Sequence, residues 1–372
     1  MDGQLDRGLR LLSLDALRGF DMIFIIGGAG LIASLCGLFP DSPFAEWLAG
    51  QMHHVKWDGF AHHDTIFPLF LFIAGISFPF SLSKQRLAGV TNGTICLRVL
   101  RRMLVLFALG LVYNGLFRLQ WDTLRLPSVL GRIGVAWGLA ALMCVWLRPQ
   151  VRAWVSVALL VGYSLLLTIP APDVAEGVGT LTKEGNIVGY IDRLLMPNHI
   201  YWRGVMDPEG VLSTLPAVVT AMLGIFTGEW VLRPNVSGGR KVLAMAVAAV
   251  VMLVLGMVWS LWQPINKMLW TSPFVLTAGA YSLAMFALFY YIIDVRGHRR
   301  WANFLRIVGV NSITIYLLQE IVNFNGVTRF FLGGLAEVLP EEWGAVVLSL
   351  GYLVVCWGVL WLLDRKKIYL KV

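Results

Sequence analysis

The sequence predicts an all-α, polytopic membrane protein, and three of its features lead to that class. Hydrophobic residues make up 58% of the 372 residues and charged residues only 14%, whereas a soluble globular protein usually carries about 25% charged residues. The apolar residues form ten blocks, each long enough to cross a hydrocarbon layer about 30 Å thick as a helix. The basic residues lie in short clusters between these blocks. A soluble enzyme, a disordered chain and a secreted disulfide scaffold are therefore excluded.

About ten transmembrane helices are expected in one bundle, which makes the whole chain, residues 1–372, a single domain. With the N-terminus inside, 21 of the 30 Lys and Arg residues fall on inner segments. This bias places both termini in the cytoplasm. The outer face then has long loops near 39–64 and 171–210 and a shorter one near 323–342. The expected spans are 15–38, 65–83, 99–118, 129–147, 153–170, 211–232, 242–262, 273–293, 305–322 and 343–363.

The distribution of charge argues against a nucleic-acid partner, and the cysteine spacing argues against disulfides and a zinc site. The net charge of +8 is spread over the short inter-span clusters, with no basic domain interleaved with aromatic residues, so nucleic acid is not an expected partner. The cysteines show no CxxC spacing, so neither a disulfide framework nor a zinc site is indicated. They are Cys36, Cys96, Cys144 and Cys356.

An ionisable side chain at membrane depth is a functional candidate, because it is costly unless paired or hydrated. Asp15 and Arg18 lie three residues apart on one face of the first span and can pair. One interpretation is a structural ion pair at the inner interface. The other is that Arg18 faces an anionic cofactor that enters from the cytoplasm.

The densest group of polar residues lies just before and into the second span. Histidine is the side chain best suited to proton transfer near neutral pH, and a carboxylate, either Asp58 or Asp64, could orient an imidazole there. Four of the six histidines fall within eleven residues: His53, His54, His62 and His63.

The same segment also allows plainer interpretations. Asp64 or Thr65 is a suitable N-cap with Pro68 in or near the first turn, so part of the motif is helix initiation. An interfacial histidine-rich loop has the same composition. No metal is expected, because no His-x3-His pair or cysteine partner completes a site.

Further polar residues occur near the outer ends of later spans. The carboxylates Asp207 and Glu209 either cap the sixth span or face a sugar-sized ligand. Arg132 lies just inside the outer end of the fourth span, and Asn266 and Lys267 lie between spans seven and eight.

The ninth span and two tryptophans complete the set of candidates. Asn311, Ser312 and Glu320 lie within the ninth span, where Glu320 is costly without a partner or a water-lined cavity. Trp57 and Trp270 either stack on sugar rings or belong to an interfacial aromatic belt.

Together these motifs resemble the heparan-α-glucosaminide N-acetyltransferase family and its bacterial relatives. The segment from Leu14 to Gly19 also looks like the opening of the wider transmembrane acyltransferase group. The resemblance implies a multi-pass protein that moves an acetyl group from cytoplasmic acetyl-CoA to an amino sugar on the far side of the membrane. It follows the family's order over most of the chain. The matching stretches are 13–19, 54–59, 64–68, 207–210, 266–270 and 311–320.

The resemblance also implies roles for individual residues. The family's catalytic histidine corresponds to His54 and its helix-start aspartate to Asp64, while the other nearby histidines have no counterpart. Human-type enzymes have a functional asparagine late in the first helix, where this sequence has Gly27-Gly28-Ala29-Gly30. A group that polarises the acetyl carbonyl is therefore expected from another part of the chain.

The function that follows is acetyl transfer across a bacterial inner membrane. Acetyl-CoA would enter from the cytoplasm, with its phosphates held by Arg18 and some of Arg98, Arg101 and Arg102. His54 would take the proton from the acceptor amine, and an acetyl-histidine intermediate is the main variant. The catalytic candidates are His54, Asp64 and Asp58. The candidates that bind acetyl-CoA or stabilise the oxyanion formed from its carbonyl are Asp15, Arg18, Arg132, Asn311 and Ser312. The candidates that bind the sugar are Trp57, Asp207, Glu209, Asn266, Lys267, Trp270 and Glu320.

A transporter for amino sugars or short oligosaccharides is the rival interpretation. It predicts substrate flux without acetyl-CoA, and its common folds show hydropathy symmetry between halves, which this sequence lacks. Under either interpretation the expected partners are an amino-sugar or glycan ligand and the lipid bilayer, and a homodimer is left open.

Overall fold

The computed structural model describes residues 11–370, and every named element within them is a helix. The predicted all-α class is confirmed for this part of the chain. Eight helices are long and apolar enough to cross a membrane, and one bent pair brings the number to nine. They are α1 (Leu12–Ile23) continuing through η1 (Phe24–Gly28) into α2 (Ala29–Gly37), α4 (His62–Leu87), α6 (Val129–Trp146), α7 (Pro149–Leu166), α9 (Thr214–Val231), α10 (Gly238–Trp259), α11 (Ser272–Tyr290) with η4 (Tyr291–Val295), the bent pair α12 (Ala302–Val310) and α13 (Ser312–Ile321), and α15 (Glu341–Arg365).

Each of the ten predicted spans falls on a helix, but one of these helices is not among those apolar enough to be a candidate membrane span. That helix is α5 (Asn92–Tyr113), which carries Arg98, Arg101 and Arg102 in its first half. The number of ten spans and the cytoplasmic position of both termini stay predictions. Arg7, Arg10 and Lys371, which contribute to the charge bias, lie outside the described residues.

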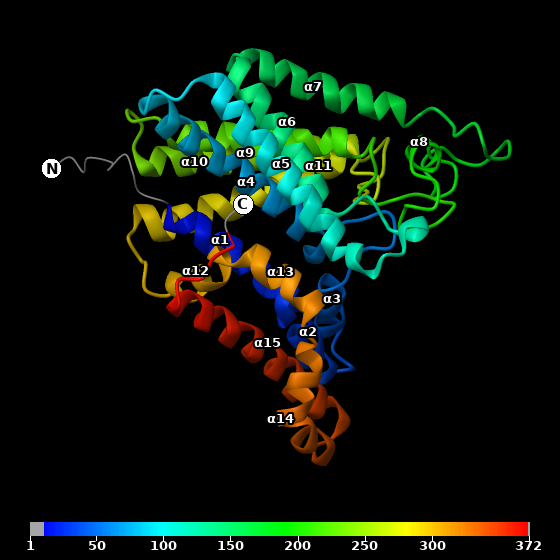
Figure 1. The fold of residues 1–372 in the computed structure, drawn as a ribbon, viewed down its shortest axis with the longest axis vertical. Coiled ribbons are helices and arrows are strands. Elements are labelled where there is room, and N and C mark those ends of the chain that lie inside the picture. Colours follow the sequence, from blue (N-terminus) through cyan, green and yellow to red (C-terminus); the bar gives the residue numbers. More distant parts are fainter. Residues whose placement is uncertain (1–10, 371–372) are drawn as a thin grey trace.

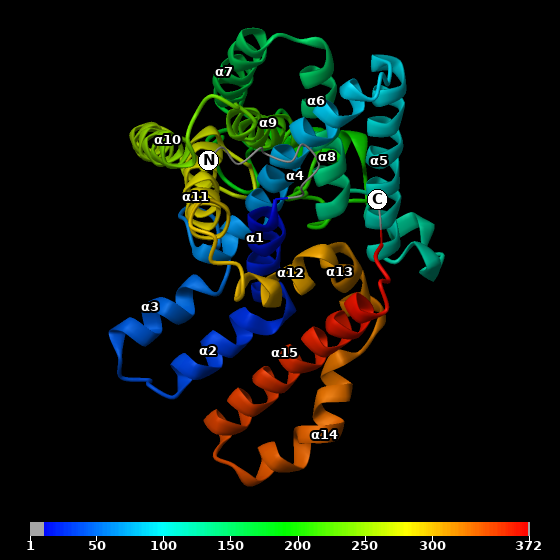
Figure 2. The same cartoon turned by 90° about the vertical axis from the view of Figure 1, so that its left-hand side faces the viewer.

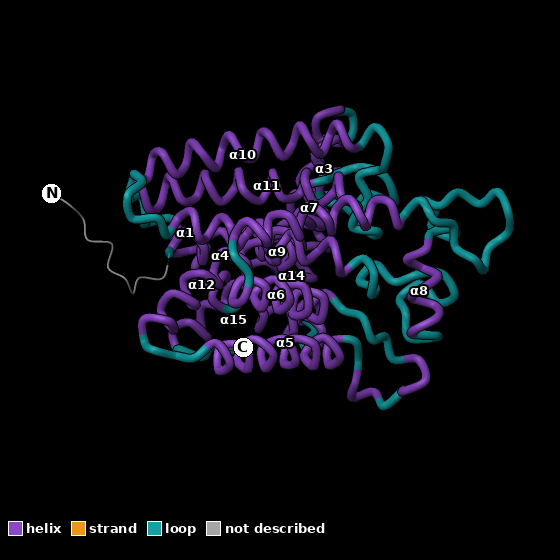
Figure 3. Tube along the Cα trace, turned by 90° about the horizontal axis from the view of Figure 1, so that it is seen from above, coloured by secondary structure: helices purple, strands orange, loops and turns teal. Residues whose placement is uncertain are grey.

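The predicted outer loops contain helices of their own. These are α3 (Pro43–Gln51), α8 (Ile187–Leu195) and α14 (Phe324–Val338). Two short helices, η2 (Leu116–Arg118) and η3 (Trp121–Thr123), lie in the connection between α5 and α6. Figure 3 shows α8 and its long flanking loops extending from one end of the bundle. Figures 1 and 2 show the hairpin of α14 and α15 reaching away from the remaining helices.

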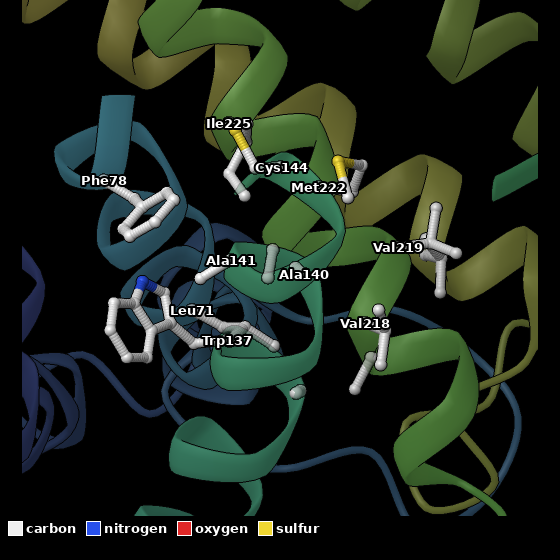
Figure 4. Close-up of a cluster of buried hydrophobic side chains, with 14 of the residues drawn as sticks. Leu71, Phe78, Trp137, Ala140, Ala141, Cys144, Val218, Val219, Met222 and Ile225 are labelled. Carbon is white, nitrogen blue, oxygen red and sulfur yellow. The ribbon is translucent and has the colours of Figure 1, made fainter. Parts of the chain in front are cut away.

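The bundle is centred on α4, which packs against α6 and α9. Figure 4 shows part of the apolar core between these helices, with Leu71 and Phe78 of α4 beside Trp137 of α6 and with Met222 on α9. The backbones of α4 and α9 approach closely because glycines lie at the crossing: a Cβ atom on Gly75 would stand 2.2 Å from the carbonyl oxygen of Ala221. This packing fixes the position of α4, whose first turn carries the candidate histidines.

The start of α4 differs from the expectation in one respect. The helix begins at His62, so its N-cap is Ala61 and Asp64 is the third helical residue. Asp64 and Thr65 are therefore not the N-cap, because the Asp64 carboxylate instead accepts the backbone N–H of Ala61 from inside the first turn. As a consequence Pro68 lies inside the helix, beyond its first turn.

Two other spans are broken rather than straight. The first bends at η1, where Gly27 has a φ of +116° that favours glycine. The ninth bends by 61° at Asn311, between α12 and α13. Close contact of α1 with α12 holds these two broken spans side by side, since a Cβ on Gly19 would stand 1.8 Å from the carbonyl oxygen of Leu305.

Candidate active site

A cavity of about 650 Å³ extends through the bundle from one end towards the other. Its wall includes Arg18 and Arg306 at one extreme and His54 and Lys267 at the other. Arg18 and Arg306 lie in the second turns of α1 and α12, whereas His54 precedes α4, which runs in the opposite direction. Much of the remaining wall is apolar; it includes Met22, Ile25, Ile66, Phe67, Phe70 and Leu106. We call the end of the bundle that carries Arg18 and Arg306 the basic end. The cavity therefore joins the basic end to the segment that carries His54 and His63.

His54 is held by Asp64. Its Nδ1 lies 2.8 Å from Oδ1 of Asp64, and the His54 side chain is 47% exposed while that of Asp64 is 2% exposed. The carboxylate also accepts the backbone N–H groups of Val55 and Ala61, each at 3.3 Å. Because Asp64 is fixed by the first turn of α4, it orients the imidazole, and its carboxylate favours the tautomer with the proton on Nδ1 and the lone pair on Nε2.

Lys267 completes this group from the loop before α11. Its Nζ lies 3.0 Å from Nδ1 and 3.3 Å from Nε2 of His54, and 3.5 Å from Oδ1 of Asp64. Burial lowers the pKa of Lys267, and the nearby Asp64 carboxylate opposes that shift. A cation thus stands beside the imidazole at the cavity wall, where negative charge that develops on a substrate would be stabilised.

The other histidines take different positions. His63 lines the cavity with its ring centroid 4.4 Å from that of His54. His62 packs against the rings of Phe24 and Tyr281. His53 is exposed. Of the four, His54 is the one that contacts both a carboxylate and a lysine.

The carboxylates before α9 are joined by an arginine that the sequence did not single out. Arg125 donates through Nε and Nη2 to both oxygens of Asp207, at 2.9 and 2.6 Å, and also contacts Glu209. Hydrogen bonding and charge from these carboxylates raise the pKa of Arg125 despite its burial. Asp207 is fully buried and accepts the N–H groups of Tyr201 and Glu209, whereas Glu209 lines the cavity.

Asp192 of α8 supports this turn from behind. Its carboxylate accepts the backbone N–H of Asp207 at 3.2 Å and that of Val211 at 3.0 Å. Burial raises the pKa of Asp192 to about 6. Asp207 and Asp192 thus shape the loop, and Glu209 is the acidic side chain that this turn offers to the cavity.

Three candidates near the outer end lie outside the cavity wall. Asn266 is buried and its Oδ1 accepts the N–H of Leu269, which closes a tight turn. Trp270 is buried against Phe67 and Phe274. The Arg132 guanidinium is buried and donates to the carbonyl of Gly210 at 3.3 Å and to the Ser213 hydroxyl.

The ninth span divides its polar residues between the cavity and the exterior. Ser312 lines the cavity, and Asn311 is buried at the bend with no hydrogen-bond partner for its side chain among the described residues. Glu320 lies at the far end of α13, where it is exposed and 3.4 Å from Arg118. Its charge is thus partnered near the loops rather than inside the bundle.

The remaining candidates lie in the histidine loop and at the basic end. Trp57 is half-buried and its indole donates to the carbonyl of Leu181 at 2.8 Å, which ties this loop to the 171–210 loop. Asp58 is exposed. Asp15 lies 3.6 Å from Arg18, so the predicted pairing is present while Arg18 also faces the cavity.

Comparison with known proteins gives one consistent relationship. The curated heparan-alpha-glucosaminide N-acetyltransferases of Homo sapiens and Mus musculus are 24% and 27% identical to this chain over 368 and 369 aligned residues. Each alignment covers 84% of this chain. The chain is a relative of the heparan-α-glucosaminide N-acetyltransferases. It spans about half the length of these two relatives, 53% and 54% respectively, and no family model matches it.

The segment where the resemblance places the family asparagine is the kink of η1 and the start of α2, and Gly27 to Gly30 carry no polar side chain there. Gly27 lies against Tyr352 of α15, and a Cβ there would stand 2.7 Å from the ring. Lys267, Glu209, Ser312 and His63 are among the polar or charged side chains that line the cavity with His54. The described residues contain no group of three or more His, Cys, Asp or Glu side chains arranged to hold a metal ion.

Three residues near the cavity were not predicted from the sequence: Arg125, Arg306 and Tyr369. Arg125 is one of the few basic residues on the predicted outer side, and this unusual position could have marked it as a candidate. Arg306 lines the basic end and is paired with Asp364 at 2.9 Å, and Tyr369 lines the same end and donates to Asp364. The C-terminal segment gave no motif that would have indicated its approach to α12.

Proposed function

We propose that the chain is an integral membrane acetyltransferase that transfers acetyl from acetyl-CoA to the amine of a glucosamine-type sugar. The observation that carries this proposal is the cavity between the basic end and the His54–Asp64 pair. The donor would enter at the basic end from the cytoplasm, and the acceptor would arrive from the periplasmic side of a bacterial inner membrane. The relationship to the N-acetyltransferases supports the type of reaction.

The chemistry assigns one task to each cavity residue. The sugar nitrogen attacks the thioester carbonyl carbon, a C–N bond forms, and the C–S bond breaks. His54 takes the proton from the amine on Nε2 and returns it to the departing thiolate, so that CoA leaves as a thiol. Asp64 keeps the ring oriented and balances the imidazolium while it exists.

Lys267 is the group we assign to the oxyanion of the tetrahedral intermediate. It lines the cavity beside His54, whereas Arg132 and Asn311, the earlier candidates, are not among the lining residues. A fixed cation beside the reacting carbonyl stabilises the negative charge that develops on its oxygen. Glu209 would hydrogen-bond the hydroxyl groups of the sugar. Association into a homodimer stays a prediction.

The test is acetyl transfer by the purified protein in detergent, with acetyl-CoA and glucosamine, measured as acetylated sugar and released thiol. His54→Ala should lower kcat/KM by about 100-fold or more, and the matched variant His53→Ala should leave it unchanged. Equal activity of wild type and His54→Ala would refute the role of His54. Glucosamine flux into proteoliposomes without acetyl-CoA, together with no transfer by the wild type, would favour the transporter.

A further inference from the structure

A second hollow lies beside the catalytic cavity, between α4 and α5. Its volume is about 680 Å³, and its floor is Trp137 of α6. Three of its lining residues are Arg98, Arg101 and Arg102 of α5. Arg102 also lines the catalytic cavity, so the two spaces share a wall.

Within residues 11–370, the arginines of this hollow have no acidic partner. No carboxylate lies within ion-pair distance of any of the three among the described residues, although Arg98 donates to Oε1 of Gln85 at 2.7 Å. Arg102 stacks on Trp137 at 4.4 Å, and its buried Nε finds no hydrogen-bond partner in the part of the chain that the structure describes. Three cations that converge on one space without an anion favour a ligand that brings negative charge.

The position of the hollow indicates where that ligand comes from. Arg98 and Arg102 lie about 9 and 15 Å along α5 from its start, at the basic end of the bundle. This depth is within reach of the headgroup region for an extended arginine. The neighbouring face of α5 exposes Leu97 and Leu104, as a helix surface in contact with acyl chains does.

We infer that the hollow between α4 and α5 binds the phosphate of an anionic phospholipid from the adjoining leaflet. Arg98 and Arg101, both exposed, would bind the phosphate oxygens, and the acyl chains would lie along the leucines of α5. This site goes beyond the proposed transfer reaction and does not depend on it. Ser81 and Gln85 of α4 line the opposite side and offer further hydrogen bonds to the headgroup.

Native mass spectrometry of the detergent-purified full chain tests this site. Phosphatidylglycerol and phosphatidylcholine with the same acyl chains are titrated separately, and the wild type should bind the anionic lipid more tightly. Arg98→Gln/Arg101→Gln should raise the apparent Kd for phosphatidylglycerol at least about tenfold, with little change for phosphatidylcholine. The matched control is Arg148→Gln/Arg240→Gln, which removes two exposed arginines at the same end outside the hollow.

Three outcomes would overturn the inference. The wild type could lack any preference for phosphatidylglycerol, or the control pair could lose as much affinity as the hollow pair. The third outcome concerns the other phosphate source, coenzyme A, whose binding is measured by calorimetry on the same variants. If the hollow pair weakens coenzyme A binding and leaves lipid binding intact, the arginines serve the acyl donor and not a lipid.

Discussion

His54 and Asp64, ten residues apart in the chain, are joined by a 2.8 Å contact between Nδ1 and Oδ1. The contact connects the loop before α4 to the first turn of this helix. The orientation of the imidazole therefore depends on how α4 begins. In Asp64→Asn the ring keeps its place but loses the negative charge that balances the imidazolium. We expect kcat to fall by about 100-fold or more, as measured by thiol release from acetyl-CoA.

Asp41→Asn is the control, because Asp41 is an exposed aspartate of the same outer segment. It should retain wild-type kcat. If Asp64→Asn and Asp41→Asn have equal kcat values, the carboxylate does not support the base.

Lys267→Met separates activity from stability. The loss of the cation should reduce kcat about 100-fold. Burial lowers the pKa of Lys267 below the ordinary value of 10.5, so the charged side chain costs folding free energy at neutral pH. The variant should therefore unfold at a temperature no lower than the wild type at pH 7.

The same pKa gives this comparison a pH dependence. As pH rises towards 10.5, the folded protein loses the Lys267 proton before the unfolded chain does, so the stability of the wild type rises relative to Lys267→Met. Thermal unfolding in detergent from pH 7 to this range measures the difference. Lys56→Met, at an exposed lysine, should show no such trend; a gap that stays constant with pH argues against a buried, destabilised lysine.

Arg125→Gln tests the arginine that joins the two carboxylates. It leaves fully buried Asp207 without its cation, so the free energy of unfolding should fall by about 3 kcal/mol or more. Arg118→Gln is the matched control, because Arg118 and Glu320 are 70% and 42% exposed and their pairing contributes about 1 kcal/mol at most. Similar losses in both variants would show that the buried cluster is not special.

Gly75→Ala tests the crossing of α4 and α9. The added Cβ would meet the carbonyl oxygen of Ala221, so the helices must separate and stability should fall by about 1–3 kcal/mol. Gly30→Ala meets no atom within 4 Å and should be neutral or stabilising. Thermal unfolding of the two variants compares them directly, and a stable Gly75→Ala would mean that the crossing is loosely packed.

The sequence predicted the helices, and it predicted the contact of the candidate residues His54 and Asp64, because both depend on local patterns. Long apolar runs predict spans, and the short separation of His54 and Asp64 allows them to meet around one helix start. The contact of Lys267 with His54 joins residues 213 positions apart, and no local pattern reports such a pairing. The same holds for Arg125, which contacts Asp207 across 82 positions.

The error at the start of α4 has a physical origin as well. Asp64 was expected to cap the helix from outside, and the same carboxylate performs that function from inside the first turn. Sequence preference alone does not separate these two placements. The placement matters for function, because the inward position brings the carboxylate to His54.

The fixing of His54 by α4 has an evolutionary consequence. Residues 171–210 are organised mainly by other contacts, such as the bonds of Asp192 to the turn before α9, although the Trp57 indole joins them to the histidine loop at Leu181. Under the proposed function, mutations in that outer segment would change which glycan is accepted while the Asp64 carboxylate still orients the imidazole. The fold would let a lineage diversify its acceptors while the acyl-handling chemistry is inherited intact.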